Sequence, residues 1–326
     1  MFTSVALPGA FVSPRVGHGS CTAHHGEILQ GIFPGSGGSL HRGLVTLPCN
    51  KLRSVAVFHP HGCRGLSVSP SWRVKALSAA RLTFAYLDLP LVEGVLTVHA
   101  DIPVGWGLGS STSDVIAAIR AVACAFQRRL APEVLAEIAV QAEVASDSVM
   151  FEDRAILFAQ RDGLVLEEFP LGLPALEVLG VNTDLDGSGI DTLLMRPAEY
   201  SQWEVEAFRP LLGLLRRALH NQDAKLLGRV ASASARINQR HLPKPYFDHF
   251  ERLGEEVGAV GLQVAHSGSV IGILFDGTSP DTEERIEEAR AKVAEMEFGS
   301  SWRFTTRGDE LPPQFQGVPF VETAAN

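Results

Sequence analysis

The sequence predicts an α+β protein of two domains, and three observations lead to this prediction. The chain has 326 residues, which is long for a single hydrophobic core. A segment rich in glycine and serine, residues 103–113, joins an extended run to a helical pattern. After residue 172 the expected elements follow in the order β-α-β-β-α-β, which is the ferredoxin-like order.

The first domain is predicted to span residues 1–172 and to be rich in β-structure. Strands are expected where apolar runs are bounded by glycine or proline, and helices where alanine and leucine recur at helical spacing. The predicted strands are 27–33, 44–47, 52–58, 94–101, 155–158 and 164–169, and the predicted helices are 72–87, 115–126 and one that begins at Pro132.

The second domain is predicted to span residues 173–326, after a linker at 170–174. A strand at 176–182 precedes two or three helices, and Ser201 with Glu204 predicts a capping box at the first of them. Pro210, about two turns later, predicts a kink in that helix or a displaced start. The remaining predicted elements are strands at 262–265 and 270–275, a helix at 280–296 and a strand at 302–306.

The segment 103–113 predicts a binding site for a triphosphate. Its glycines allow a tight turn and the close approach of a ligand, and the helix behind them offers unpaired N–H groups and the positive end of its dipole. A Walker loop is excluded because no lysine is present, and a dinucleotide fingerprint because a serine replaces the third glycine. The predicted nucleotide-binding residues are Pro103, Gly105, Gly107, Leu108, Gly109, Ser110, Ser111, Thr112 and Ser113.

Composition narrows the class of protein. Hydrophobic residues make up 45% and charged residues 20% of the chain, as in folded globular proteins. The net charge of −9 argues against a general nucleic-acid-binding role. The four cysteines have no paired spacing, the N-terminus does not resemble a secretory signal, and no apolar run is long enough for a membrane span. We therefore expect a cytoplasmic protein that binds neither nucleic acid nor membrane, as a monomer or homodimer.

Two carboxylates follow the second predicted helix after the phosphate segment. Glu143 lies near the end of an otherwise apolar helix, and Asp147 lies just beyond it. The helix dipole opposes negative charge at a C-terminus, so Asp147 is locally unfavourable unless another group uses it. Phosphoryl transfer to an alcohol needs a metal that offsets charge and often a carboxylate near the attacking hydroxyl. An acidic helix end in solvent is the alternative interpretation.

Two further segments combine small and polar residues next to strands. Residues 19–31 contain the adjacent His24 and His25, for which a turn or a substrate contact is favoured over a metal site, because a strand points neighbouring side chains to opposite faces. Residues 263–272 contain a His-Ser-Gly-Ser turn between apolar runs. A plain hairpin and a functional turn remain equally open interpretations of this second segment.

The arrangement Pro-x-x-x-Gly-x-Gly-Ser-Ser resembles the phosphate loop of the GHMP kinases, and the segment from Glu143 to Phe151 resembles the Glu…Asp-x-x-x-Phe segment of several members. The resemblance implies a β-rich phosphate-loop domain followed by a ferredoxin-like domain. It also implies that ATP and Mg²⁺ are bound, with Mg²⁺ held by Glu143 and a hydroxyl of Ser110 or Ser111. Asp147 is then the candidate base or orienting group, with Ser110 beside the reaction.

Four runs, 26–31, 109–114, 242–245 and 259–272, resemble one branch of this family, the L-threonine kinases of cobalamin side-chain assembly. The likeness extends from about residue 20 to 275. This chain departs from the branch at His24-His25, where a Ser-Cys pair is expected, and at Asn50, where an Asp is expected. The resemblance and the two polar segments give the predicted substrate residues His24, His25, Gly26, Glu27, Asn50, His266, Ser267, Gly268 and Ser269.

The sequence thus predicts a Mg·ATP-dependent kinase that phosphorylates the side-chain hydroxyl of a hydroxy amino acid, with L-threonine as the leading acceptor. Three alternatives stay open. The acceptor is another small hydroxy amino acid or an amino alcohol; the protein is a kinase-like sensor that binds ATP and a metabolite without turnover; or it is an ATP-dependent decarboxylase. The last alternative is disfavoured because the sequence indicates no cluster of basic residues around an acceptor.

Overall fold

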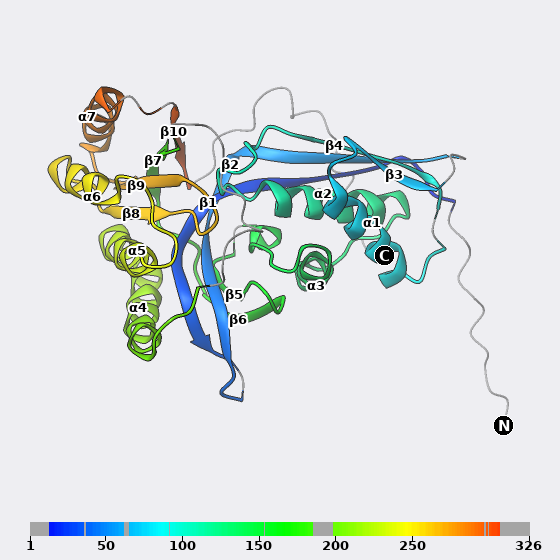
Figure 1. Cartoon of the computed structure of the whole chain (residues 1–326), viewed down its shortest axis with the longest axis horizontal. Coiled ribbons are helices and arrows are strands. Elements are labelled where there is room, and N and C mark those ends of the chain that lie inside the picture. Colours follow the sequence, from blue (N-terminus) through cyan, green and yellow to red (C-terminus); the bar gives the residue numbers. More distant parts are fainter. Residues whose placement is uncertain are drawn as a thin grey trace.

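The computed structural model of the chain describes residues 13–35, 37–61, 65–90, 92–152, 154–184, 198–296, 298 and 300–306. Within these ranges the fold is α+β, with helices packed against one ten-stranded mixed sheet (Figure 1). None of the helices in the described ranges is long and apolar enough to cross a lipid bilayer. The helices are α1 (Val74–Tyr86), α2 (Ser110–Ala125), α3 (Pro132–Glu143), α4 (Gln202–Asn221), α5 (Ala224–Asn238), α6 (Phe247–Glu256) and α7 (Thr282–Glu295), with a short 3₁₀ helix at Val149–Phe151. The strands are β1 (Gly17–Pro34), β2 (Leu40–Pro60), β3 (Leu66–Ser69), β4 (Gly94–Ala100), β5 (Ile156–Ala159), β6 (Leu164–Glu168), β7 (Leu176–Asn182), β8 (Gly261–Val264), β9 (Val270–Asp276) and β10 (Ser300–Thr305).

Two long antiparallel strands, β1 and β2, run through the molecule. The sequence predicted three short strands over the same residues. The structure extends the first of them, 27–33, into β1, and it joins the other two, 44–47 and 52–58, into β2, because residues 48–51 bend this strand without ending it. Thr22 pairs with Arg53 and the next residue, Ala23, pairs with Cys49, so residues 50–52 bulge out of the ladder. This bulge lies beside the segment of β1 that carries the two histidines.

The N-terminal half places α2 against the sheet. Strand β4 pairs with β2 in antiparallel and with β3 in parallel orientation, and α2 follows β4 through residues 101–109. Most of α2 is buried because alanine, valine and isoleucine cover several of its faces, so it packs on β1 and β2 and also on α1. Proline at the first position of α3 agrees with the predicted start of that helix.

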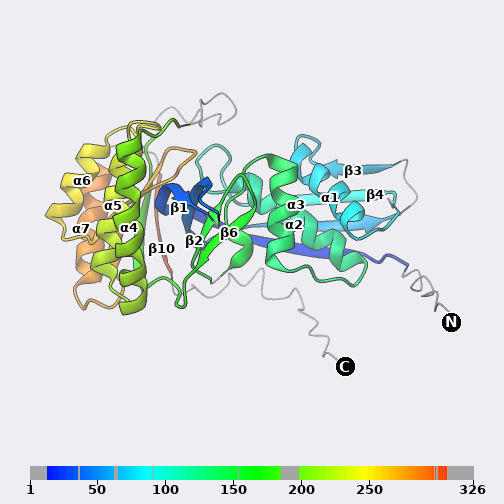
Figure 2. The ribbon, with the colours of Figure 1, turned by 90° about the horizontal axis from the view of Figure 1, so that it is seen from below.

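The C-terminal half has the ferredoxin-like order that the sequence predicted. Its strands lie in the order β10-β7-β9-β8, and three helices, α4 to α6, separate β7 from β8. The helices α4 to α7 gather on one side of these strands (Figure 2). The predicted capping box of Ser201 and Glu204 is present, and α4 begins directly after it, so Pro210 lies inside the helix without displacing its start.

One backbone pairing joins the two halves into a single sheet at the level of the histidines. Glu27 of β1 pairs with Val264 of β8. Residues from the start of the chain therefore lie beside the turn between β8 and β9. The domain boundary between residues 172 and 173 remains a prediction, since β1 and β2 take part in both halves.

Candidate active site

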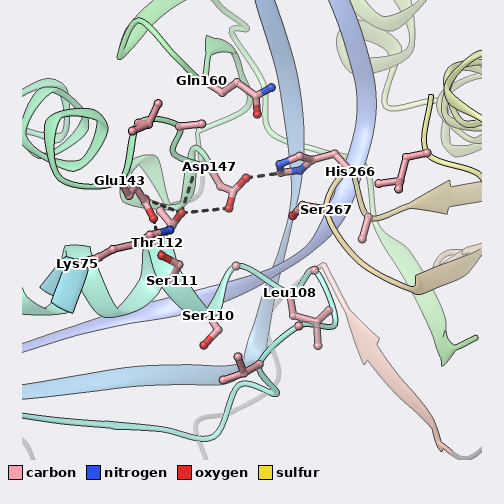
Figure 3. A pocket seen from close by; sticks show the side chains of 18 of the residues that line it. Lys75, Leu108, Ser110, Ser111, Thr112, Glu143, Asp147, Gln160, His266 and Ser267 are labelled. Atoms are coloured by element: carbon pink, nitrogen blue, oxygen red, sulfur yellow. Dashed lines mark hydrogen bonds and ion pairs between the residues drawn. The ribbon is translucent and has the colours of Figure 1, made fainter. Parts of the chain in front are cut away.

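A cavity of about 720 Å³ brings together the phosphate loop, Glu143, Asp147 and the β8–β9 turn. The loop and the first turn of α2 line one end of it, together with Trp72 and Lys75 at the start of α1. In Figure 3, Asp147 lies between the loop below it and Gln160 above it, with His266 to one side. The predicted functional segments of both halves thus face one space.

The phosphate loop turns through three glycines into an open helix end. Gly105, Gly107 and Gly109 have φ values of +83°, +82° and +76°, a region that side chains with a Cβ rarely adopt. Gly109 is the N-cap of α2, and no side chain caps this end. The N–H groups of the first turn are therefore available to an anion. Of the predicted loop residues, all but Ser113 line the cavity; Ser113 Oγ instead donates to the Thr22 carbonyl at 2.9 Å.

The loop and the β8–β9 turn touch at two glycines. A Cβ on Gly107 would lie 2.8 Å from Gly268 Cα, and a Cβ on Gly268 would lie 2.1 Å from the Trp106 carbonyl oxygen. Neither position has room for a side chain. The backbone of the turn therefore closes one wall of the phosphate-binding end.

Glu143 forms a compact group with two hydroxyls of α2. Ser111 Oγ donates to Glu143 Oε2 at 2.7 Å, and Thr112 Oγ1 donates to Oε1 at 2.8 Å. Burial raises the pKa of Glu143 to about 7, although both hydroxyl bonds and Lys75 favour the charged form. The sequence proposed Ser110 or Ser111 beside Glu143; the structure brings Ser111 there and adds Thr112, while Ser110 lines the cavity nearby.

Asp147 is buried between two histidines. Its Oδ2 lies 2.9 Å from His24 Nε2 and 3.2 Å from Thr112 Oγ1, and its Oδ1 lies 3.7 Å from His266 Nδ1. Burial acts to raise the pKa of Asp147, but the two histidines outweigh it and hold this pKa well below its usual range. The Gly26 amide donates to His24 Nδ1 at 2.9 Å, so the neutral ring of His24 carries its proton on Nε2, against Asp147.

Glu27 holds the β8–β9 turn in place. Its carboxylate accepts bonds from the backbone N–H of His266 and from Nδ1 of the same residue, both at 2.8 Å. Burial acts to lower the pKa of His266, but Glu27 and then Asp147 raise it to about 9. At neutral pH the His266 ring is therefore an imidazolium that lines the cavity beside Asp147.

Most of the remaining predicted substrate residues do not line this cavity. His24 is fully buried behind Asp147, and His25 is buried against Trp302 and Phe304 on the opposite side of β1. Ser267 does line the cavity, whereas Ser269 Oγ donates to Asn182 at 2.6 Å. Asn50, in the β2 bulge, lines a second cavity of about 260 Å³ instead.

The structure also brings basic residues to the cavity that sequence reasoning missed. Lys75 lies beside Glu143. Arg42 of β2 and Arg161 of the β5–β6 turn also line the cavity. The sequence indicated no basic cluster around an acceptor; these three residues are spread along the cavity, and that expectation stays a prediction. These residues are far apart in the chain and stand in no motif, so only the pairing of β2 with β5 brings two of them together.

Comparisons with known proteins agree with this geometry. Residues 74–151 match the model of the GHMP kinases N terminal domain. The fold is similar to that of homoserine kinase from Cytophaga hutchinsonii, with a TM-score of 0.65, 14% sequence identity and coverage of 94% of this chain and 96% of that one. Residues 74–151 thus match the family that the sequence indicated, and the fold of nearly the whole chain is similar to that of a homoserine kinase. These similarities agree with the predicted ATP-dependent phosphotransferase.

Its sequence relatives include L-threonine kinases. The chain is 28% identical over 287 residues to the L-threonine kinase of Salmonella typhimurium, which covers 86% of this chain and 89% of that protein. It is 29% identical over 276 residues to the L-threonine kinase of Citrobacter freundii, with coverage of 81% and 88%. The resemblance inferred from the four sequence runs is therefore confirmed.

Replacing Gly109 by alanine is expected to weaken ATP binding about tenfold or more. The residue has a positive φ, which costs a residue with a side chain about 1–2 kcal/mol. Its Cβ would also lie 2.3 Å from His24 Cδ2 and push that ring against Asp147. Gly213→Ala is the matched control, because nothing lies within 4 Å of its Cβ. Equal ATP dissociation constants for both variants, measured by calorimetry, would contradict this role of the loop.

Proposed function

We propose that the protein is a cytoplasmic kinase that transfers the γ-phosphoryl group of Mg·ATP to the side-chain hydroxyl of a small hydroxy amino acid, with L-threonine as the leading acceptor. The observation that carries the proposal is the position of Thr112. Its hydroxyl, in the first turn of α2, lies within hydrogen-bond distance of both Glu143 and Asp147. The open helix end and the two carboxylates therefore meet at one point, as phosphoryl transfer requires.

The loop and α2 are assigned to the triphosphate. Helix N–H groups and the dipole attract the phosphate oxygens, and the Ser110 hydroxyl and the Lys75 ammonium add donors at the same end of the cavity. Trp72, exposed at this end, is available to contact the nucleotide base. Positioning of the γ-phosphate is the largest contribution that such a site makes.

Asp147 is assigned to the acceptor hydroxyl. His24 and Thr112 fix the orientation of its carboxylate, and the two histidines keep it ionised. A pKa far below 7 makes a weak base, but a bound triphosphate adds negative charge nearby and moves this pKa upward. The carboxylate then orients the hydroxyl and accepts its proton as the phosphoryl group arrives.

The residues around Glu143 fit Mg²⁺. A buried carboxylate and two hydroxyls offer only oxygen ligands, the type that this ion prefers. Burial raises the pKa of Glu143, and a cation bound beside the carboxylate would favour its charged form. When bound, Mg²⁺ would offset phosphate charge during transfer. Glu143, Ser111 and Thr112 would hold it.

The acceptor assignment rests on the L-threonine kinase relatives and on the polar end of the cavity. We expect L-threonine to be phosphorylated better than L-serine by about 10- to 200-fold in kcat/KM, because packing of the γ-methyl contributes about 1–3 kcal/mol. L-Homoserine places its hydroxyl one carbon farther out and loses in-line geometry. A coupled ADP assay checks this order. Preference for another alcohol would leave the kinase assignment intact and contradict L-threonine as the acceptor. Absence of acceptor-dependent ADP release would favour the alternative of a kinase-like sensor without turnover.

Asp147→Asn is expected to lower kcat about 10²- to 10⁴-fold, because asparagine keeps the shape and loses both the charge and the proton acceptor. KM for ATP is expected to change little, since Asp147 is assigned to the acceptor. Asp248→Asn, an exposed aspartate paired with Arg236, is the matched control. A kcat loss of only about tenfold would indicate orientation without proton transfer. An unchanged kcat would indicate that Asp147 has no role in the reaction, as in the alternative interpretation of an acidic helix end.

Glu143→Gln is expected to raise the Mg²⁺ concentration needed for half-maximal activity by about 10- to 100-fold. Because the pKa of Glu143 is about 7, protonation below pH 7 removes the anionic ligand, so the Mg²⁺ requirement of the wild type rises as pH falls from 8 to 6. The glutamine variant lacks this titration and is expected to show a flatter dependence. Glu137→Gln, on the exposed face of α3, is the control. Identical Mg²⁺ titrations for Glu143→Gln and wild type would contradict the assignment.

A further inference from the structure

We propose that Arg42 binds the carboxylate of the acceptor and so makes the enzyme specific for hydroxy acids over amino alcohols. The proposal rests on the proposed function and deepens it, because it names the group of the acceptor that is recognised and the residue that recognises it. It concerns the end of the cavity away from the phosphate loop. This end is lined by Gln30, Arg42, Gln160, Arg161, Tyr200 and Asn238.

Arg42 is half-buried and held in a fixed position. Its Nη2 donates to the Ala198 carbonyl at 2.5 Å, and its guanidinium carbon lies 5.9 Å from the centre of the Tyr200 ring. Tyr200 is itself fixed, since its hydroxyl donates to Asn238 Oδ1 at 2.6 Å. The guanidinium is therefore oriented before any ligand arrives, which lowers the entropy cost of binding.

The guanidinium of Arg42 has no carboxylate in direct contact in the part of the chain that the structure describes. No carboxylate in those ranges forms an ion pair with it, in contrast to Arg154 and Arg216, which pair with Glu168 and Glu167. Arginine stays protonated at any relevant pH, and a partly desolvated guanidinium is stabilised by a carboxylate that accepts two parallel bonds. Arg42 lines the cavity, so its remaining N–H groups can donate to a carboxylate bound there.

Arg42 is tied to Asp147 by two backbone hydrogen bonds through Gln160. The Gln160 N–H donates to the Arg42 carbonyl at 3.2 Å, and the Ser146 N–H donates to the Gln160 carbonyl at 2.9 Å. Figure 3 shows Gln160 on the side of Asp147 away from the phosphate loop. An acceptor whose hydroxyl lies at Asp147 would therefore extend its other groups toward Arg42, in the direction opposite to ATP.

The distribution of charge favours an acceptor carboxylate over a nucleotide phosphate at Arg42. The triphosphate end already has the open helix terminus and Lys75, and Arg73 beside it is paired with Asp114. Arg161 also lines the far end but is exposed at a turn, so it contributes charge without a fixed position. An amino alcohol would leave the half-buried Arg42 without a partner.

The test compares L-threonine with L-threoninamide, which replaces the carboxylate by a neutral group of similar shape. Initial rates of ADP release give kcat/KM for both acceptors with the wild type, Arg42→Gln, Arg42→Lys and the control Arg216→Gln, whose arginine pairs with Glu167 outside the cavity. The wild type and Arg216→Gln are expected to prefer threonine. In Arg42→Gln this preference is expected to fall about 10- to 100-fold, because KM for threonine rises, whereas KM for ATP stays unchanged. Arg42→Lys is expected to recover part of the preference.

The outcomes separate this proposal from the proposed function. If threonine is phosphorylated and the ratio of kcat/KM for threonine to kcat/KM for threoninamide is the same in Arg42→Gln and wild type, the role of Arg42 is overturned and the proposed function stands. A raised KM for ATP with an unchanged KM for threonine overturns this role of Arg42 in favour of a nucleotide contact. Another alcohol could be the preferred acceptor. If this acceptor is a hydroxy acid, and Arg42→Gln lowers the ratio of its kcat/KM to that of its amide, the proposal is supported. If the preferred acceptor has no anionic group, the proposal is overturned. Absence of ADP release with every alcohol overturns both proposals.

Discussion

A buried row of alternating carboxylates and histidines holds the site together. Glu27, His266, Asp147 and His24 come from β1, from the turn after β8 and from the loop after α3, and each lies within 4 Å of the next. Removing these groups from water is costly, and the cost is offset only while every charge keeps its opposite partner. The row therefore requires all three segments to adopt their positions together. It also keeps Asp147 ionised in an environment that would otherwise protonate it.

The row explains why the two halves of the molecule are equally necessary to the chemistry. The phosphate loop and Glu143 belong to the N-terminal half, whereas His266 belongs to the ferredoxin-like half. The contact between Gly107 and Gly268 brings the backbone of the turn directly against the loop. Neither half contains a complete site, although the N-terminal half alone carries the matched family domain.

Local patterns in the sequence predicted the parts of the site that lie on one stretch of chain. The phosphate loop, its helix and the carboxylates Glu143 and Asp147 are of this kind, because glycine spacing and helix ends determine where they lie. The contact of His24 with Asp147 and the position of Arg42 in the cavity were not predictable, because they depend on how strands pair across the sheet. The bulge at 50–52 shows why: it shifts the register of β2 against β1 and carries Asn50 into a different cavity. Spacing along one strand gives no indication of such a shift.

The continuity of β1 and β2 has a mechanical consequence. Their ladder extends from the pair Gly17 and Phe58 to the pair Pro34 and Leu40, and the two strands run from the side of the N-terminal helices to the edge of the ferredoxin-like strands (Figure 1). Within the described residues, the ferredoxin-like strands pair with this ladder at Glu27 and Val264, so a rotation of one half against the other would act on that pair and on the packing of α4 and α5 against β1. The continuous ladder itself would move as one body in such a rotation.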